Sequence, residues 1–442
     1  MSFEKESLSI LHEALNRLEE GFKELPAHEA ETDTAGLRRV MLDVAEKMQD
    51  NYPYHHPLYA GQMLKPPHAI ARLAYMLAMW INPNNHALDG GRASSAMEKE
   101  AVADIAGMFG WKTHLGHLCG GGTIANMEAL WISGNLHPGR KIAASAQAHY
   151  THSRLSEVLR LPFQSIACDA RGRMDLNALE DTLKKGDVGT VVATLGTTAA
   201  GAVDPLADIL DLKAKYHFRL HVDAAYGGYF ILADNLAAET RRAFDRISEA
   251  ESIVVDPHKH GLQPYGCGCV LFKDPSVGKF YKHDSPYTYF SSEDLHLGEI
   301  SLECSRAGAS AVALWATMQM FPLTRGGKFA KGLADSRNAA ISLFEKIKES
   351  DQFLTAFPPE LDILIWAPRA GKASEMSKQS KAIFAAAARQ NLHLAVASFP
   401  KALLESHWDL DWDQEQIACL RACLMKPEHL DWAEEIGKLL MD

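Results

Sequence analysis

Four continuous apolar segments lie between residues 189 and 272, and helical patterns separate the first three of them. Most side chains in these segments are apolar, as expected of strands that are buried on both faces of a sheet. The intervening residues 205–216 and 235–247 carry apolar residues at helical spacing. This alternation predicts an α/β fold with a mostly parallel central sheet that is covered by helices. The expected strands are residues 189–196, 218–225, 252–256 and 267–272.

The chain is expected to have three parts. Residues 1–97 hold an amphipathic helix over 7–25 and an ordered proline-rich loop at 51–68. The apolar stripe of that helix packs either on its own domain or on a second subunit, so this part is a candidate for dimer contacts. Residues 98–325 are expected to form the large α/β domain. Residues 326–442, with longer helices and fewer strands, are expected to form a smaller C-terminal α+β domain.

Charge and cysteine content exclude several classes of protein. The 45 basic and 56 acidic residues give a net charge of -11, whereas broad nucleic-acid binding needs concentrated Lys and Arg. No apolar run approaches the roughly 20 residues of a membrane helix, and the charged N-terminal residues do not resemble a secretory signal. Seven cysteines, an odd number, fit free thiols better than a disulfide framework. A soluble cytoplasmic protein without nucleic-acid or membrane partners is therefore expected.

Lys259 follows the expected strand 252–256, within the motif DPHKHG. A lysine at the carboxyl edge of a buried sheet is costly unless it has a function. Burial and a nearby cation are expected to lower its pKa towards the free amine that Schiff-base formation requires. Taken alone, the motif also fits a solvated loop lysine.

Asp223 closes another apolar strand, in the motif HVDAAYGG. A buried carboxylate needs a cationic partner. A protonated pyridine nitrogen is such a partner, and keeping it protonated makes the ring an electron sink. The small residues Ala224 and Ala225 would let a flat ring lie close to the backbone. The alternative is a structural aspartate paired with an arginine.

A run of three glycines leads through Thr123 into a helical pattern, in GHLCGGGTIANMEAL at residues 116–130. A glycine-rich turn that enters a helix presents free backbone N–H groups to a phosphate, and the helix dipole assists. The run matches neither GxGxxG nor GxxxxGK[ST], so dinucleotide and P-loop sites lack their fingerprints.

His149 follows an expected strand at AASAQ, where its imidazole could stack on a cofactor ring. A structural histidine is the alternative. His149 with His152, or Cys267 with Cys269, could also suggest a metal pair. Neither pair has a third and fourth ligand at recognisable spacing, so no metal site is expected.

The glycine turn, the stacking histidine, the aspartate and the lysine follow successive strand ends in that order. Ligands of open α/β sheets bind at the carboxyl ends of the strands. The order therefore predicts that these four features form one cofactor site.

These residues resemble the group II pyridoxal-dependent decarboxylases, which include the glutamate, cysteine-sulfinate, aromatic-amino-acid and histidine enzymes. The similarity runs from about His56 to Arg421, and DPHKHG and HVDAAYGG are its most specific motifs. It implies the type I fold of pyridoxal-phosphate-dependent transferases, as in aspartate aminotransferase, and a homodimer with shared active sites. The implied reaction removes the α-carboxylate of an L-amino acid and gives an amine and CO₂.

The resemblance also implies how pyridoxal 5'-phosphate is held. Lys259 would form the Schiff base, and Asp223 would pair with the pyridine nitrogen. His149 and Ala225 would lie on the two faces of the ring, with Thr197 beside it. The phosphate would be held by Gly121, Gly122, Thr123 and His258.

Further matches concern the substrate. Arg421, in CLRACLMKPEH, would bind the substrate carboxylate, which suits the planar guanidinium. Gln62, in HPLYAGQM, occupies a position where some acid-specific members carry glutamine, so it favours an acidic side chain. SPYTYFSSEDLHLGE resembles the mobile loop that protonates the substrate carbon, with Tyr287 and Tyr289 as candidates. Arg306, in SLECSRAGAS, would lie near the cofactor phosphate, either of its own chain or across the dimer interface.

Two other functions remain open on these grounds. A carbon–carbon lyase or an aldehyde synthase could use the same cofactor and the same site. Tyrosines in the loop favour simple decarboxylation over these. A non-catalytic binding protein is the other possibility, but every chemically required residue type is present.

Overall fold

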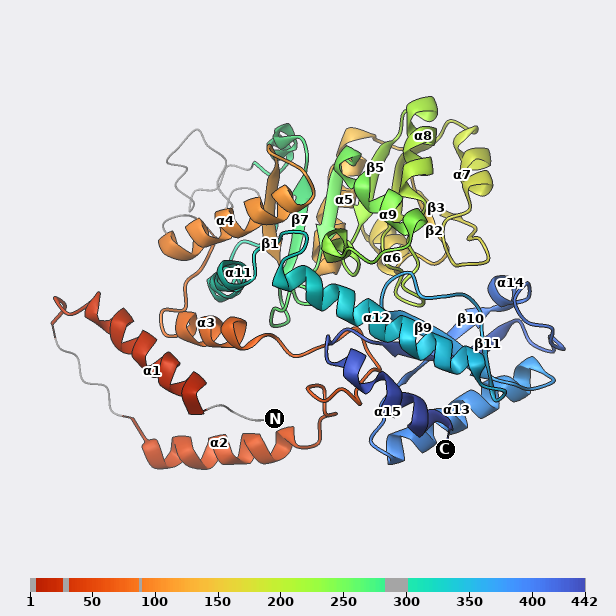
Figure 1. The fold of residues 1–442 in the computed structure, drawn as a ribbon. Helices are drawn as coiled ribbons and strands as arrows, with labels where there is room; N and C mark the ends of the chain where they lie inside the picture. The colour runs from red at the N-terminus through yellow and green to blue at the C-terminus, as the bar shows by residue number, and fades with distance from the viewer. Residues whose placement is uncertain (1–4, 27–31, 87–89, 283–300, 442) are drawn as a thin grey trace.

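The structure is a computed structural model that describes residues 5–26, 32–86, 90–282 and 301–441 (Figure 1). Its centre is a sheet of seven strands in the order β1-β7-β6-β5-β4-β2-β3. Strands β2 to β6 pair in parallel, while β7 runs antiparallel to both of its neighbours. The strands are β1 (Leu115–Cys119), β2 (Lys141–Ser145), β3 (Phe163–Ile166), β4 (Val188–Thr194), β5 (Arg219–Asp223), β6 (Ser252–Val255) and β7 (Gly268–Phe272).

All four strands expected from the apolar segments are present, with ends that differ by one or two residues. Every residue of β4, β5, β6 and β7 is buried, which is why these strands read as continuous apolar runs. The predicted α/β class with a mostly parallel sheet is therefore confirmed.

Helices cover both faces of this sheet because alternate strand residues point to opposite sides. In β6, Ile253 and Val255 pack in the core shared with α4, α7, α8, α9 and α11, whereas Val254 packs with α5. Helix α6 extends the second layer, where Leu155 packs with Val192 of β4. The helices are α4 (Arg92–Met108), α5 (Gly122–Leu136), α6 (Thr151–Val158), α7 (Leu176–Leu183), α8 (Leu206–Tyr216), α9 (Ala238–Asp245) and α11 (Gly308–Met320).

Three short 3-10 helices complete this part of the chain. They are η1 (Gly228–Leu232), η2 (Ile247–Glu249) and η3 (Pro275–Phe280). The first follows the Asp223 strand directly and is buried throughout, so it fixes the chain behind that carboxylate.

The C-terminal part contains a second, antiparallel sheet in the order β10-β11-β9-β8. Helix α12 starts two residues after the predicted boundary at residue 326 and runs along this sheet (Figure 1). The small antiparallel sheet with helices agrees with the expected α+β composition, while the domain limits remain a prediction. The elements are α12 (Lys328–Glu349), β8 (Phe353–Thr355), β9 (Ile363–Pro368), α13 (Ala373–Arg389), β10 (Ala395–Pro400), α14 (Lys401–Leu404), β11 (Gln416–Cys423) and α15 (His429–Met441).

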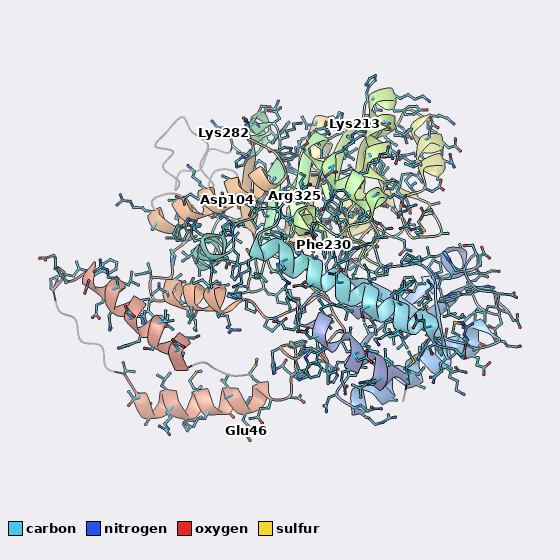
Figure 2. The ribbon with its side chains drawn as sticks, in the orientation of Figure 1. Glu46, Asp104, Lys213, Phe230, Lys282 and Arg325 are labelled. Carbon is cyan, nitrogen blue, oxygen red and sulfur yellow. The ribbon has the colours of Figure 1, made fainter. Side chains whose placement is uncertain are left out.

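The N-terminal part consists of α1 (Lys5–Glu20), α2 (Thr34–Met48) and α3 (Ala69–Met79). The predicted helix over 7–25 is too long, because α1 ends at Glu20 and hydrogen-bonded turns follow. Helix α1 lies against α3, but no residue of α2 is buried. Figure 1 shows α1 and α2 apart from both sheets, and Figure 2 shows the labelled Glu46 on the outer side of α2.

The proline-rich segment 51–68 forms neither helix nor strand, as predicted. A bridge between Tyr59 and His393 and backbone hydrogen bonds from Ala60 to His393 and from Cys423 to Ala60 join it to the C-terminal part of the chain. Among the described residues, no helix has the length and apolar character needed to cross a membrane.

Lys426 follows β11 and is almost completely buried, with its ammonium donating to the carbonyl of Tyr59. Burial lowers the pKa of Lys426 from 10.5 to about 7, and Lys65 assists. Between these two values the unfolded chain binds a proton that the folded chain lacks, so the free energy of unfolding rises with pH across this window.

We expect Lys426→Met to remove this rise, which amounts to at most about 1.4 kcal/mol per pH unit. Denaturant unfolding from pH 7 to pH 10, at one protein concentration, measures the difference from the unmodified protein. Replacing the exposed Lys381 with methionine is the control. An unchanged pH slope in Lys426→Met would contradict the assignment.

Candidate active site

A pocket of about 300 Å³ lies at the carboxyl ends of β1, β4, β5 and β6. It brings together the glycine turn, His149, Asp223 and Lys259, which come from four separate segments of the chain. These are the four features whose order along the chain predicts one site. Further lining residues are Gly120, Ile124, Asn126, Thr151, Thr194, Gly196, Thr198, Tyr226 and Asp256.

Lys259 reaches into this pocket beside a carboxylate. Its Nζ lies 3.0 Å from Oδ2 of Asp256, which is 2% exposed. Burial lowers the pKa of Lys259, but Asp256 and Asp223 together outweigh burial and raise it above its ordinary value. The expectation of a lowered pKa is therefore wrong, because the nearest charges are two carboxylates and not a cation. The ammonium must lose a proton before it can attack a carbonyl, and Asp256 is the adjacent acceptor.

Asp223 is held by two donors at the end of β5. Its Oδ2 lies 2.8 Å from Nε2 of His152, and its Oδ1 accepts from the amide of Ala225 at 3.1 Å. Burial raises the pKa of Asp223, but His152, Lys259 and the Ala225 amide outweigh burial and hold it below its usual value. The carboxyl group is thus ionised throughout the neutral range. Its side-chain partner is a histidine, not the arginine considered as an alternative.

The glycine turn forms part of the wall of the pocket. Gly121 precedes α5 with a φ of +144°, which is accessible to glycine but not to residues with side chains. A Cβ at Gly122 would lie 2.7 Å from Oδ2 of Asp256, so this position also requires glycine. The first amide of α5 bonded within the helix is that of Ala125. The amides before it, up to Ile124, are therefore available to an anion in the pocket.

His149 presents its imidazole to the same pocket. Its Nδ1 lies 2.8 Å from Oγ1 of Thr151, and its ring packs on Tyr150 with centroids 4.5 Å apart. Burial lowers the pKa of His149, and Lys259 and His152 add to this effect. A neutral ring held in this way suits stacking on a flat aromatic group.

Three other residues from the expected cofactor shell lie in or beside the pocket. Ala225 and His258 line it, but Thr197 does not. The Thr197 side chain is buried and accepts a hydrogen bond from the amide of Ala202 at 3.0 Å. Its neighbours Gly196 and Thr198 provide the pocket surface instead. The hydroxyl of Thr197 therefore holds the turn that shapes this wall.

Neither of the expected substrate residues that the structure describes, Arg421 and Gln62, lines the pocket itself. Arg421 is buried on β11, and its guanidinium donates to the carbonyls of Ala199, Gly61 and Thr198. These three bonds leave two of its five N–H groups for another acceptor. Gln62 is exposed and does not line the pocket. Tyr287 and Tyr289 lie outside the described residues.

Arg306 is occupied elsewhere in the chain. Its guanidinium bonds to the buried carboxylate of Glu98 and to the carbonyls of Leu118 and Asn85. Arg306 is not among the residues that line the pocket. In its own chain Arg306 is thus neutralised by a buried acidic partner away from the pocket, and its approach to a phosphate across the dimer interface stays a prediction.

Two residues of the site were missed at the level of sequence. From the sequence, Asp256 is only the last residue of an expected strand. The available signal for its contact with Lys259 is the spacing of a carboxylate three residues before a lysine. His152 was considered only as a partner of His149 for a metal ion. Its true partner, Asp223, is 71 residues away in the chain, so no local pattern indicates the contact. Among the described residues, no group of three metal-binding side chains occurs.

The conserved domain of pyridoxal-dependent decarboxylases matches residues 131–363. The chain belongs to this family. The match includes the His149, Asp223 and Lys259 segments, and it makes the chain a pyridoxal-phosphate-dependent amino-acid decarboxylase.

Curated relatives of this decarboxylase differ in the amino acid they act on. The L-tyrosine decarboxylase of Enterococcus faecium is 29% identical over 412 residues, covering 70% of this chain and 67% of that protein. The L-aspartate decarboxylase of Thermococcus kodakarensis is 28% identical, covering 64% and 73%. The L-2,4-diaminobutyrate decarboxylase of Acinetobacter baumannii is 28% identical, covering 60% and 58%.

Solved structures share the fold of this decarboxylase. Mouse CSAD in its apo form has a TM-score of 0.77 at 20% identity and covers 96% of this chain and 91% of its own. Oryza sativa TDC with PLP and tryptamine has a TM-score of 0.79 at 18% identity, with coverage of 100% and 99%. The expected type I fold is thereby confirmed.

The pocket of this decarboxylase fits pyridoxal phosphate. The uncapped amides of Gly122, Thr123 and Ile124 suit the phosphate, and the ionised Asp223 suits a pyridinium nitrogen. Lys259 lies between Asp256 and the open pocket, where an aldehyde could meet its amine. The donor set and the charges therefore agree with the cofactor of the family.

Proposed function

We propose that the pocket carries out α-decarboxylation of an L-amino acid, with Lys259 as the lysine that binds the cofactor. The observation that carries this proposal is the convergence of Lys259, Asp223 and the glycine turn on one pocket at the strand ends. When bound, pyridoxal phosphate supplies an electron sink for the electron pair that remains on the α-carbon when CO₂ leaves. The chain's residues bind, orient and transfer protons around that group.

Each end of the cofactor has a matching set of protein groups. Asp223 keeps a proton on the pyridine nitrogen, because its carboxylate stays ionised in the folded protein. The turn at Gly121 and Gly122, with Thr123 and His258, lines the pocket and would hold the phosphate. His149 and Ala225, which both line the pocket, would hold the ring between an imidazole and a methyl group. Thr197 contributes indirectly, through the turn that Thr198 extends into the pocket.

Proton transfer at the reacting end involves Lys259 and its neighbours. Asp256 lies 3.0 Å from the Lys259 ammonium and accepts its proton before the amine is used. His258, whose pKa burial lowers, lines the same pocket and is one candidate donor to the substrate carbon. Tyr287 and Tyr289 are the others, on the basis of the loop motif that they occupy.

Arg421 is proposed to bind a carboxylate of the substrate. Its backbone partners, including Thr198 of the pocket wall, fix the guanidinium beside that wall and leave two donors free. Gln62 follows Gly61, whose carbonyl also accepts from Arg421. This arrangement supports an acidic amino acid as the first candidate substrate, and the relatives named for tyrosine, aspartate and 2,4-diaminobutyrate supply the competitors.

The direct test measures CO₂ release by the protein loaded with pyridoxal phosphate. The panel contains aspartate, glutamate, cysteine sulfinate, tyrosine, tryptophan and 2,4-diaminobutyrate, and the organic products are identified by mass. Release of CO₂ with an equal amount of amine supports the proposal. An aldehyde with ammonia would identify an aldehyde synthase, and no CO₂ from any amino acid would reject the proposed reaction.

We also propose that the protein is a homodimer and that α2 contributes to its interface. Helix α2 exposes apolar side chains at three- and four-residue spacing, so they form one stripe. Such a continuous apolar stripe is unfavourable in water and is typical of an interaction surface. The stripe consists of Leu37, Val40, Met41, Val44 and Met48.

The double change Met41→Glu and Val44→Glu is expected to weaken dimerisation by at least about 100-fold, because each lost apolar contact costs roughly 1.5–3 kcal/mol. Sedimentation across a range of protein concentrations measures the dissociation constant. Glu46→Lys is the matched control, because the helical spacing of α2 places Glu46 on the side opposite the apolar stripe. A double variant that dimerises like the control would place the interface elsewhere.

A cytoplasmic location is the final part of this proposal. All seven cysteines are free thiols, which suits a reducing compartment. Five of them are buried inside the protein, namely Cys119, Cys267, Cys269, Cys419 and Cys423.

A further inference from the structure

His152 and Asp223 form a buried pair behind the pocket. Nε2 of His152 lies 2.8 Å from Oδ2 of Asp223, with side chains that are 1% and 6% exposed. Asp223 lines the pocket, whereas His152 does not, so the histidine contacts the carboxylate from the protein side. It stands in the first turn of α6, three residues after His149.

The chemistry of the pair determines the direction of this hydrogen bond. An ionised carboxylate can only accept, so Nε2 of His152 must carry the proton. Nδ1 of His152 is buried and has no hydrogen-bond partner among the described residues. The second ring nitrogen therefore offers no competing contact, and the histidine is directed to Asp223 alone.

The two donors fix the plane of the carboxylate. The amide of Ala225 holds Oδ1 and the imidazole of His152 holds Oδ2. Each oxygen has a second lone pair, which remains free for a donor in the pocket. Without His152, Asp223 could rotate about its side-chain bonds, and a buried lone pair would lose its donor.

We propose that His152 is a positioning residue that keeps Asp223 oriented and ionised, so that the cofactor nitrogen retains its proton. The inference rests on the proposed role of Asp223. By stabilising the carboxylate, the histidine favours the ionised carboxylate with a protonated pyridine over the neutral acid with a neutral pyridine. His152 thereby acts on the cofactor through another residue and does not touch the reacting atoms.

A second buried pair provides a matched control. Nε2 of His117 lies 2.9 Å from Oε2 of Glu128, with exposed fractions of 1% and 0%. Neither residue lines the pocket. Loss of the hydrogen bond between His117 and Glu128 should lower the stability of the protein about as much as loss of the bond between His152 and Asp223. It should not change cofactor binding or protonation of the cofactor nitrogen.

The test compares His152→Met, His152→Gln and His117→Met as loaded proteins. Methionine fills the space without a donor, whereas the amide of glutamine reaches about as far as Nε2 of histidine and can donate. Pyridoxal phosphate labelled with ¹⁵N in its ring reports protonation of the nitrogen by NMR, and titration of the unloaded proteins gives the cofactor dissociation constant.

In His152→Met we expect the ¹⁵N signal to move towards the position of an unprotonated nitrogen. Cofactor binding should become about tenfold weaker and kcat about tenfold lower, because the variant loses one hydrogen bond to a charged group. His152→Gln should restore all three properties to near the unmodified values. His117→Met should lower the melting temperature only. If His152→Met does not fold, His152→Asn, whose shorter amide does not reach Asp223, carries the same expectation.

The proposal is overturned if the variant without a donor keeps the unmodified ¹⁵N signal and cofactor affinity, or if His152→Gln is as impaired as His152→Met. Neither the NMR signal nor the dissociation constant requires turnover. A protein that releases no CO₂ would therefore reject the proposed reaction while leaving the role of His152 open to this test.

Discussion

Lys259→Ala is expected to reduce decarboxylation by at least about 10³-fold, because the variant lacks the amine that binds the cofactor covalently. Alanine also removes the partner of Asp256, whose Oδ2 lies 3.0 Å from the lysine nitrogen. The pocket would retain the glycine turn and Asp223, so cofactor binding should persist in a weaker, non-covalent form.

Borohydride reduction followed by peptide mass spectrometry measures this directly. In the unmodified protein the reduced cofactor should be attached to the peptide that contains Lys259, and in Lys259→Ala no peptide should carry it. Lys273, which donates to the carbonyl of Ser248 away from the pocket, provides the control variant Lys273→Ala. Attachment at another lysine, or full activity of Lys259→Ala, would refute the assignment.

Asp223→Asn is the second change with a large expected effect. The substitution keeps the size of the side chain but removes the charge that holds a proton on the pyridine nitrogen. Without that proton the ring is a poor electron sink, so kcat is expected to fall by roughly 10³-fold or more. Cofactor affinity should fall as well, because a buried ion pair loses one partner.

Steady-state kinetics and cofactor titration measure the two effects separately. Glu128→Gln is the control, since Glu128 is a buried carboxylate that also pairs with a histidine but does not line the pocket. It is expected to lower thermal stability while kcat changes little. Near-normal kcat in Asp223→Asn would show that another group protonates the ring.

The fold could be predicted from the sequence where burial of a strand or helix produces a recognisable pattern of apolar residues. Strands β4, β5, β6 and β7 are buried on both faces, and their apolar runs located them to within one or two residues. The exposed helix α1 was predicted too long, because its apolar stripe continues to Leu25 while the helix ends at Glu20. Apolar spacing at a surface does not mark where hydrogen bonding stops.

The site could be predicted where its residues follow strand ends. Parallel strands place their carboxyl ends at one edge of the sheet, so the glycine turn, His149, Asp223 and Lys259 are brought to one pocket. The direction in which a side chain points is harder to predict from the sequence. The Thr197 side chain points into the protein, where its hydroxyl accepts a hydrogen bond from the amide of Ala202. This contact stabilises the turn between Thr197 and Ala202 and directs the hydroxyl away from the pocket.

The sequence by itself determined the α/β architecture, the family and the set of residues at the strand ends, because these depend on local pattern and on order along the chain. Only the tertiary structure decided how those residues are charged and held. Lys259 has a raised pKa because Asp256 and Asp223 lie beside it, Asp223 is oriented by a histidine from another segment, and Arg306 is neutralised by Glu98. Electrostatic interactions depend on distance in space, and the spacing of residues along a chain does not record it.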